Sequence, residues 1–255
     1  MNPLIPTIDV LGLRVASASV ESLAEIERLY REAVPALVTY VNAHSLNLAG
    51  RDAEYRSLLQ ERFLVFKDGV GVGIAARMLG AKFPENITFT DFSPLVLCLA
   101  AERKWRVFFL GGEAGVAETA ARRLTREIPG LDVAGSRDGF TVWHSSAEAI
   151  AGIRAARTDL LVVAMGNPVQ EKWLAEHLGE TGARMGLAVG GYLDFAAGHR
   201  KRAPVWWQRL RIEWIHRLLC EPRRMWRRYV VGNPEFLLRV VLYRLRRGRN
   251  GALRG

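Results

Sequence analysis

Short apolar runs that end in Gly, Asn or Asp alternate along the chain with longer segments in which apolar residues recur every three to four positions. Runs of the first kind are typical of buried strands, and the longer spacing is typical of helices packed on a sheet. The predicted strands are 36–42, 63–68, 105–112, 160–166 and 185–191, with a weaker one at 86–90. The predicted helices are 45–60, 70–79, 94–103, 116–127, 147–157 and 169–178. This alternation favours an α/β fold with a parallel sheet.

The pattern changes near residue 200, where the segments stay helical but become strongly basic. From residue 200 onward, 16 Lys and Arg stand against three Asp and Glu, which gives +13; the whole chain carries +10, so residues 1–199 carry −3. Four of the seven Trp lie in this segment, namely Trp206, Trp207, Trp214 and Trp226. Interleaved cations and aromatic rings indicate an anionic partner, either a membrane surface or a nucleic acid. We therefore divide the chain into an α/β domain, 1–199, and a basic appendage, 200–255.

Several bulk features indicate the compartment. The first ten residues lack the charged and apolar regions of a signal peptide, and no apolar run reaches the about 18 residues of a spanning helix. Cys98 and Cys220 lie far apart in apolar segments, so we interpret both as buried thiols in a reducing compartment. The sequence thus indicates a cytosolic protein that meets a membrane, if at all, from the cytoplasmic face.

Candidate site residues follow the predicted strands, because ligands of parallel sheets bind at the carboxyl edge. Asp68 lies in a turn with Gly69 and Gly71, where it is either a carboxylate that faces a cleft or a helix N-cap. Asp91 follows the weaker strand. The other strand-end candidates are Asn42, Gly111, Gly112, Gly166, Asn167, Pro168, Gln170, Gly190, Gly191 and Asp194.

Two of these motifs have competing interpretations. Gly111 and Gly112 precede a helix, and this arrangement suits either a diphosphate held by backbone amides or a packing turn. A dinucleotide site would also require a well-placed acidic residue after the next strand. Gln170 and Glu171 follow Pro168 on the first turn of a predicted helix. An amide there suits a base edge or a sugar hydroxyl, whereas the alternative is an ordinary helix start.

The sequence offers no recognisable metal site. The five His residues show no paired spacing, and no Asp-x-Asp motif is present to hold a divalent cation on a nucleotide diphosphate. We therefore expect no metal and no cofactor, and the arginines of the appendage are the candidates for stabilising charge on a diphosphate.

A set of short motifs occurs in a fixed order along the chain. They are Asn42-Ala43, Asp68-Gly69, Thr90-Asp91, the glycines after Phe109-Leu110, Met165 through Glu171, Gly190-Gly191 with Asp194, Arg202-Ala203-Pro204, Glu213-Trp214 and Pro222-Arg223-Arg224. Together they resemble the WecG/TagA/CpsF family of bacterial glycosyltransferases from about residue 8 to about residue 230. The resemblance implies a Rossmann-like α/β catalytic domain and a C-terminal appendage that binds membrane and helps to complete the active site.

The resemblance also implies an activity. A hexosyl unit would pass from a UDP-sugar to a sugar carried on a polyprenyl diphosphate, with inversion and without a metal. Asp68 matches the proposed catalytic base, and Asn42 lies beside it in the sugar pocket. Gln170 and Asp194 match positions that hold the nucleotide. Arginines of the appendage would contact the diphosphate, and we choose Arg211, Arg217, Arg224 and Arg227. The other motif residues assigned to substrate binding are Asp91, Gly111, Gly112, Gly166, Pro168, Glu171, Gly190, Gly191 and Arg202.

This chain departs from part of the family pattern. Tyr40 stands where many N-acetylmannosaminyltransferases have Thr, and His44 stands where they have Glu. The segment 89–94 is more similar to the exopolysaccharide glucosyltransferase branch, so UDP-glucose is the slightly favoured donor beside UDP-N-acetylmannosamine. The sequence is compatible with a monomer or with a homo-oligomer.

Proteins of other classes could also carry a basic, aromatic tail. A nucleic-acid-binding protein would explain the tail but not the strand-end Gly, Asp and Gln residues, so we expect no nucleic-acid partner. A nicotinamide oxidoreductase shares the fold class. A non-catalytic scaffold on a lipid surface would fit if Asp68 were only a helix cap.

Overall fold

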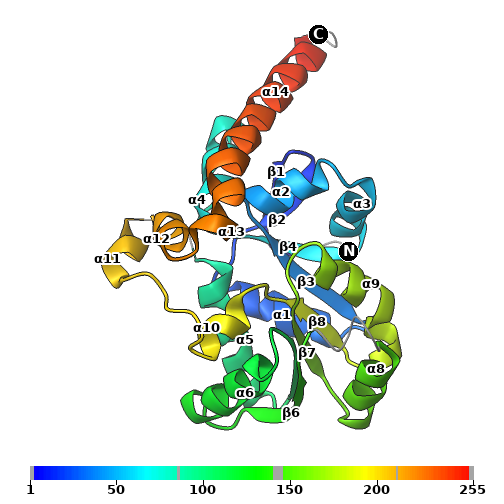
Figure 1. Ribbon diagram of the computed structural model, residues 1–255. Coiled ribbons are helices and arrows are strands. Elements are labelled where there is room, and N and C mark those ends of the chain that lie inside the picture. Colours follow the sequence, from blue (N-terminus) through cyan, green and yellow to red (C-terminus); the bar gives the residue numbers. More distant parts are fainter. Residues whose placement is uncertain (1–2, 85–86, 140–145, 211, 253–255) are drawn as a thin grey trace.

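A single mixed sheet forms the centre of the computed structural model, which describes residues 3–84, 87–139, 146–210 and 212–252 (Figure 1). Its strand order is β1-β2-β4-β3-β8-β7-β5-β6. Only the β1–β2 pair is antiparallel, and every other neighbouring pair is parallel. The bounds are β1 Thr7–Val10, β2 Leu13–Ala16, β3 Ala36–Val41, β4 Phe63–Lys67, β5 Arg106–Gly111, β6 Asp132–Arg137, β7 Leu160–Ala164 and β8 Met185–Ala188.

Helices cover both faces of the sheet. Their bounds are α1 Ser22–Tyr30, α2 Ala43–Ala49, α3 Ala53–Glu61, α4 Gly69–Met78, α5 Phe89–Glu102, α6 Val116–Glu127, α8 Ser146–Ala155, α9 Val169–Thr181 and α10 Tyr192–Ala196. Alternate strand residues point to opposite cores, so Val38 joins a core with α1, α5, α6 and α10, while Leu37 joins one with α2, α3, α4, α8 and α9. The predicted α/β fold and its five main strands are confirmed.

Two predicted elements differ from the structure. The helix expected at 45–60 is two helices, because the chain turns after Ala49 and the Asp52 side chain caps α3 by accepting from the Tyr55 amide at 2.9 Å. The weak strand expected at 86–90 is wrong, since α5 begins at Phe89. The Thr88 side chain caps that helix by accepting from the Asp91 amide, so a helix start lies within the segment that was expected to be a strand.

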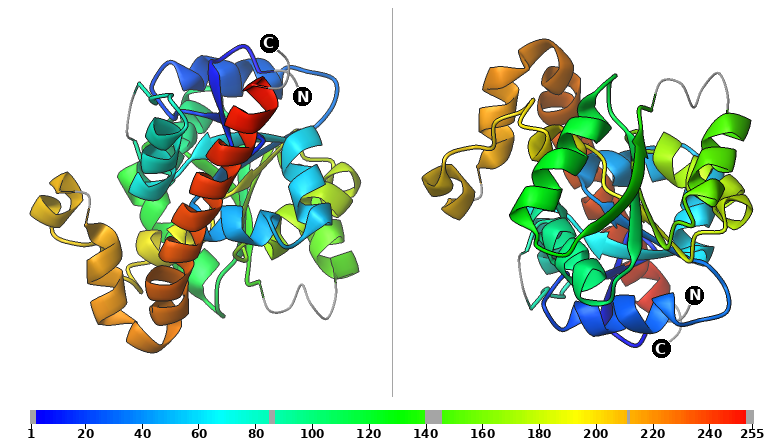
Figure 2. Two further views of the ribbon diagram at one scale, coloured as in Figure 1. Left: turned by 90° about the horizontal axis from the view of Figure 1, so that it is seen from above. Right: turned by 90° about the horizontal axis from the view of Figure 1, so that it is seen from below.

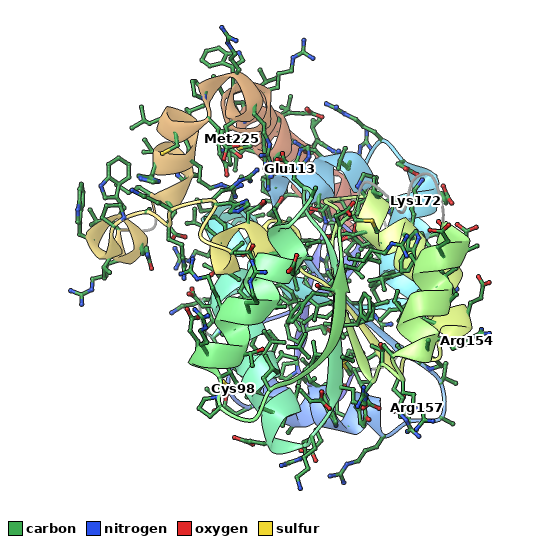
Figure 3. All side chains as sticks on the ribbon, turned by 60° about the horizontal axis from the view of Figure 1, so that its bottom comes forward. Cys98, Glu113, Arg154, Arg157, Lys172 and Met225 are labelled. Atoms are coloured by element: carbon green, nitrogen blue, oxygen red, sulfur yellow. The ribbon has the colours of Figure 1, made fainter. Side chains whose placement is uncertain are left out.

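The expectation that both cysteines are buried is also wrong. Cys98 and Cys220 are free and exposed. Figure 3 shows Cys98 at the outer edge of the molecule. Cys98 lies on α5 between Leu97 and Leu99, which are buried in the core, so an apolar neighbourhood in sequence did not place the thiol on the inner face of the helix.

The basic segment forms a chain of helices that ends in one long helix. They are α11 Val205–Arg209, α12 Glu213–Cys220, α13 Pro222–Trp226, the π-helix η1 Arg227–Val231 and α14 Gly232–Ala252. α14 packs against α2 and α4, and its far end extends from the body (Figures 1 and 2). Phe236 and Val240 of α14 are buried in the same core as α2 and α4. Among the described helices, none combines the length and the apolar character needed to cross a membrane.

Candidate active site

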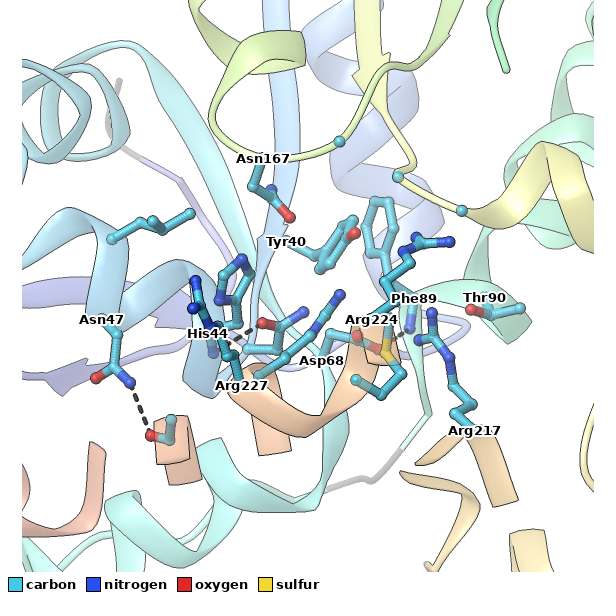
Figure 4. Close-up of a pocket in the computed structure, with 18 of the residues that line it drawn as sticks. Tyr40, His44, Asn47, Asp68, Phe89, Thr90, Asn167, Arg217, Arg224 and Arg227 are labelled. Carbon is cyan, nitrogen blue, oxygen red and sulfur yellow. Dashed lines mark hydrogen bonds between the residues drawn. The ribbon is translucent and has the colours of Figure 1, made fainter. Parts of the chain in front are cut away.

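A cavity of about 580 Å³ opens at the carboxyl ends of β3, β4, β7 and β8 (Figure 4). The appendage forms its opposite wall, with residues from α12, α13, η1 and the start of α14. Of the candidate site residues, those that line the cavity are Asn42, Asp68, Gly166, Asn167, Gly190, Gly191, Arg217, Arg224 and Arg227. The cavity therefore joins strand ends of the body to a segment that follows them by 25 or more residues along the chain.

Asp68 follows β4 at the N-cap position of α4, but its carboxylate forms no cap of that helix. Instead, Oδ1 accepts a hydrogen bond of 3.0 Å from the backbone amide of Phe89, the first residue of α5. Its own amide donates to the Val41 carbonyl at 2.8 Å. The carboxylate is thus directed across the cavity floor and away from the helix that follows it.

Asn42 has a local structural task. Its Oδ1 accepts from the amides of His44 and Ser45, both at 3.1 Å, and the Ser45 hydroxyl accepts from the Asn42 amide at 2.7 Å. This capping box fixes the start of α2. Because Oδ1 accepts the two capping hydrogen bonds, the side-chain NH2 group is the part of Asn42 that can bind a ligand.

Tyr40 of β3 lies in the floor beside these two residues. Its ring packs on Phe89 with centroids 5.0 Å apart. A Cβ on Gly190, where φ is +55°, would lie 2.0 Å from the Tyr40 hydroxyl oxygen. Gly190 is therefore required by the close approach of this phenol as well as by its backbone conformation. Burial, with the charge of Asp68, raises the pKa of Tyr40, so the hydroxyl stays protonated.

Gln170 and Glu171 lie behind the cavity wall and are fully buried. Gln170 accepts from the Gly190 amide at 2.9 Å through Oε1 and donates to Glu171 at 2.8 Å through Nε2. Glu171 Oε1 also accepts from Thr39 at 2.8 Å and from Asn167 at 2.6 Å. Neither Gln170 nor Glu171 lines the cavity, whereas Asn167 does.

The appendage wall is strongly cationic. Arg217 lies over the Phe195 ring at 5.9 Å, and Arg224 pairs with Glu221 at 2.8 Å. Arg228, which the sequence did not single out, also lines the cavity, and its Nε is buried without a partner among the described residues. Arg217, Arg227 and Arg228 form no salt bridge within the described part of the chain. Unpaired guanidinium groups on one wall suit an anionic ligand.

His44 is a further lining residue, and it carries no charge near neutral pH. Burial lowers its pKa to about 4, and the neighbouring Arg228 and Arg51 act in the same direction. The imidazole therefore contributes hydrogen-bonding nitrogens rather than a cation to the cavity.

Asp91 and Asp194, which were predicted to bind substrate, form ion pairs with arginines at the start of the appendage. Arg202 lies 2.5 Å from Asp91 and 3.3 Å from Glu213 of α12. Arg200 lies 3.5 Å from both Asp194 and Glu221. Although burial alone would raise it, the pKa of Asp91 is lowered by hydrogen bonds from Arg202 and Thr88. These ion pairs tie α5 and α10 to the helices that carry the cavity arginines.

Three further predicted residues, Gly111, Gly112 and Pro168, do not line the cavity. Gly111 approaches β7 so closely that a Cβ would lie 2.3 Å from the Ala164 carbonyl oxygen. The Gly112 amide donates to that same oxygen at 2.9 Å, so this glycine pair packs closely against the end of β7. Pro168 precedes α9, and Arg211 falls outside the described residues. No cluster of three or more His, Cys, Asp or Glu side chains that could hold a metal occurs in the described part of the chain.

The fold and the cavity define an α/β protein whose site lies at the carboxyl edge of a parallel sheet, where the two halves of the sheet meet at β3 and β8. The chain belongs to the family described as "Glycosyl transferase WecG/TagA/CpsF family", whose profile matches residues 8–250, and it is therefore a glycosyltransferase. The resemblance inferred from the motifs is thus confirmed.

Two curated relatives carry the same printed name, N-acetylglucosaminyldiphosphoundecaprenol N-acetyl-beta-D-mannosaminyltransferase. The protein from Bacillus spizizenii (strain ATCC 23059 / NRRL B-14472 / W23) is 30% identical over 193 residues, which cover 76% of this chain and 74% of the relative. The protein from Bacillus subtilis (strain 168) is 28% identical over 208 residues, which cover 82% of this chain and 80% of the relative.

Proposed function

We propose that this glycosyltransferase moves a hexosyl unit from a UDP-sugar to a sugar carried on a polyprenyl diphosphate, with inversion at the anomeric carbon. The observation that carries the proposal is the cavity that places the Asp68 carboxylate opposite the unpaired arginines of the appendage. A carboxylate and a cationic wall match the two needs of the reaction, a proton acceptor and a site for a diphosphate. The names of the two relatives support the lipid-diphosphate acceptor.

In the proposed reaction, Asp68 is the general base. The acceptor hydroxyl oxygen forms a bond to the anomeric carbon from the face opposite UDP, and its proton passes to the Asp68 carboxylate. The bond between the anomeric carbon and the diphosphate oxygen breaks, and its electron pair leaves with UDP. Arg217, Arg224 and Arg227, together with Arg228, stabilise the charge that develops on the diphosphate. Asn42 contributes its amide group to the sugar pocket.

The donor sugar is the part of the proposal that depends on residues particular to this chain. The Tyr40 phenol and the neutral His44 lie in the cavity, and the phenol fills space that a smaller side chain would leave open. We favour UDP-glucose over UDP-N-acetylmannosamine, because a filled floor leaves less room for an acetamido group. The names of the relatives favour the second sugar, so both donors belong in the test.

We further propose that the appendage places the cavity at the cytoplasmic face of the membrane that holds the acceptor. Exposed apolar side chains lie on the appendage beside its basic residues: Val205, Trp206, Leu210, Leu219, Trp226, Leu238, Val241, Leu242 and Leu245. Apolar burial combined with roughly 1 kcal/mol per Lys or Arg near anionic lipid supports reversible binding at the surface.

The experiment that tests the function is UDP release by the full chain, with UDP-glucose and with UDP-N-acetylmannosamine, in EDTA. Each donor is tested with and without a lipid-diphosphate-linked N-acetylglucosamine acceptor. We expect release from one donor that depends on the acceptor and persists in EDTA. Acceptor-independent release, or loss of release in EDTA, would contradict the proposed transfer mechanism. A salt-sensitive shift of nucleic acid without UDP binding would favour the nucleic-acid-binding alternative.

A further inference from the structure

Glu171 is a fully buried carboxylic acid on the first turn of α9, directly behind the cavity. One of its oxygens, Oε1, accepts three hydrogen bonds, from Thr39 Oγ1, Asn167 Nδ2 and Gln170 Nε2, at 2.8, 2.6 and 2.8 Å. The donors come from β3, from the loop after β7 and from α9. A single carboxyl oxygen thus joins three segments of the chain.

Two of these hydrogen bonds lead to the cavity. Asn167 lines it, and Figure 4 shows its side chain above Tyr40. Gln170 uses its other end to accept from the Gly190 amide at 2.9 Å, and Gly190 is the residue that Tyr40 approaches. Glu171 therefore does not line the cavity itself but is hydrogen-bonded to Asn167 and Gln170, which belong to or hold the loops after β7 and β8.

The second oxygen of Glu171, Oε2, is buried and has no partner among the described residues. Burial raises the pKa of Glu171 to about 7, although hydrogen bonds from Gln170, Thr39 and Asn167 act to lower it. The titratable groups that interact electrostatically with Glu171 are Tyr55 of α3 and Tyr40 of β3. Burial raises the pKa of both, so both hydroxyls stay protonated and uncharged.

The other charged groups of the neighbouring elements have partners elsewhere. On α8, Glu148 pairs with Arg137, and Arg154 donates to the Glu180 carbonyl. On α3, Asp52 and Glu54 pair with Lys172. Strands β7 and β8 contain no titratable residue.

We propose that Glu171 is a positioning residue for the transfer reaction: its carboxylate holds Asn167 directly, and Gly190 through Gln170, at the cavity. Hydrogen bonds to an ionised carboxylate are roughly twice as strong as those to a neutral acceptor, so the ionised form holds both loops more firmly than the neutral form. The proposed hexosyl transfer provides the kinetic measurement, and the inference rests on that function; the position of Gly190 can be followed without it.

The first test observes the Gly190 amide by NMR. Labelling with ¹³C-carbonyl Val and ¹⁵N-Gly selects the four Val-Gly pairs, whose glycines are Gly71, Gly73, Gly190 and Gly232. We expect the Gly190 resonance to titrate near pH 7 in the wild-type chain and to stay fixed in Glu171→Gln. In Thr39→Val, one hydrogen bond to the carboxylate is lost, so the titration should move to higher pH. A Gly190 resonance that does not titrate in the wild type, or that titrates equally in Glu171→Gln, overturns the proposal.

The second test compares the pH dependence of kcat/KM in the same variants. At pH 8, Glu171→Gln should have a kcat/KM about 10-fold below that of the wild type. The neutral Gln side chain, like a protonated Glu171, holds the two loops less firmly than the carboxylate does. The wild-type kcat/KM should fall to the level of the variant as the pH is lowered and Glu171 is protonated. A change in kcat/KM with pH that occurs in both proteins is due to the titration of other groups. Equal kcat/KM values at pH 8 overturn the proposal. Absence of turnover in the wild type with every donor contradicts the proposed function instead, and the Gly190 titration still decides the role of Glu171.

Discussion

At the scale of single residues, the cavity depends on how each carboxyl oxygen is used. In Asp68, Oδ1 accepts from the amide that begins α5, and this bond orients the carboxylate toward the cavity. In Glu171, one oxygen carries three hydrogen bonds and the other has none among the described residues. The first arrangement suits a group that meets a ligand, and the second suits a group that organises its neighbours.

Asp68→Asn should greatly reduce transfer without loss of the fold. The amide oxygen still accepts from Phe89, but the side chain can no longer take a proton, so turnover should fall by roughly 10²- to 10⁴-fold. The measurement is kcat with the preferred donor and acceptor, beside thermal unfolding. Asp132→Asn, an exposed change on edge strand β6, is the matched control. Near-normal turnover by Asp68→Asn would remove Asp68 as the base.

The buried acid also predicts how stability changes with pH. The pKa of Glu171 rises from 4.5 in a solvated carboxyl to about 7 in the fold, so the folded state binds more protons between these values. The free energy of unfolding should therefore decrease as pH rises from about 4.5 to about 7, by an amount on the order of 3 kcal/mol from this group.

Denaturant unfolding at several pH values measures this decrease. In Glu171→Gln, the free energy of unfolding should decrease less between pH 4.5 and 7 than in the wild type. The variant should be more stable than the wild type at pH 8, although it is expected to be less active there. A stability difference between Glu171→Gln and the wild type that is the same at all pH values would show that folding does not shift the pKa of Glu171.

At the scale of elements, α14 has two apolar faces with different surroundings. Phe236 and Val240 are 1% and 0% exposed in the core against α2 and α4, whereas Leu238 and Leu245 are 59% and 60% exposed. Leu238, Val241, Leu242 and Leu245 recur at helical spacing, so they form one outward stripe. Arg239 faces the body instead, donating to the Asn47 carbonyl at 2.9 Å.

Replacing this stripe should separate membrane binding from folding. The double variant Leu238→Gln, Leu242→Gln should bind vesicles of anionic lipid several-fold more weakly, because less apolar surface can enter the interface. Its thermal unfolding should match that of the wild type. Val34→Gln, at an apolar residue that is 74% exposed on the body, is the control and should bind normally. Unchanged vesicle binding by the double variant would assign lipid contact to another part of the appendage.

The sequence predicts the central elements well, because a buried strand and a helix on its surface have different apolar periods. It misses β6, whose sequence Asp-Val-Ala-Gly-Ser-Arg has little apolar character, and the β1–β2 hairpin, which is short. It joins α2 and α3, because the break at Gly50 to Asp52 lies within one continuous helical pattern. In each case a tertiary contact or a single helix cap determines the element, and the local pattern of apolar residues does not reveal either of them.

At the scale of the whole molecule, the cavity exists only where body and appendage meet. The rule that ligands bind at strand ends found Asn42, Asp68 and Gly190. It could not distinguish Gln170 and Glu171, which lie one layer behind the cavity, or foresee that Arg228 would line it, because the orientation of the appendage follows from long-range packing. Tyr40 was recognisable only as a departure from the family pattern.

A chain truncated before residue 205 should lose more than the arginines that line the cavity. Removing α13 and α14 exposes the surfaces that Met225, Phe236 and Val240 cover, and loss of one buried Phe side chain typically costs 3–5 kcal/mol. We therefore expect both inactivity and a lower unfolding midpoint. The variant Arg217→Gln, Arg227→Gln should be inactive with a normal midpoint, and this contrast separates the two roles. A truncated chain with unchanged stability would show that the body folds independently of α14.

The two exposed thiols make the junction between body and appendage open to direct observation. Cys98 lies on α5 of the body and Cys220 at the end of α12, and they are the two cysteines of the chain. Spin labels or fluorophores attached there would report one distance across the junction without any engineered residue. The same pair can be followed before and after addition of donor, acceptor or vesicles.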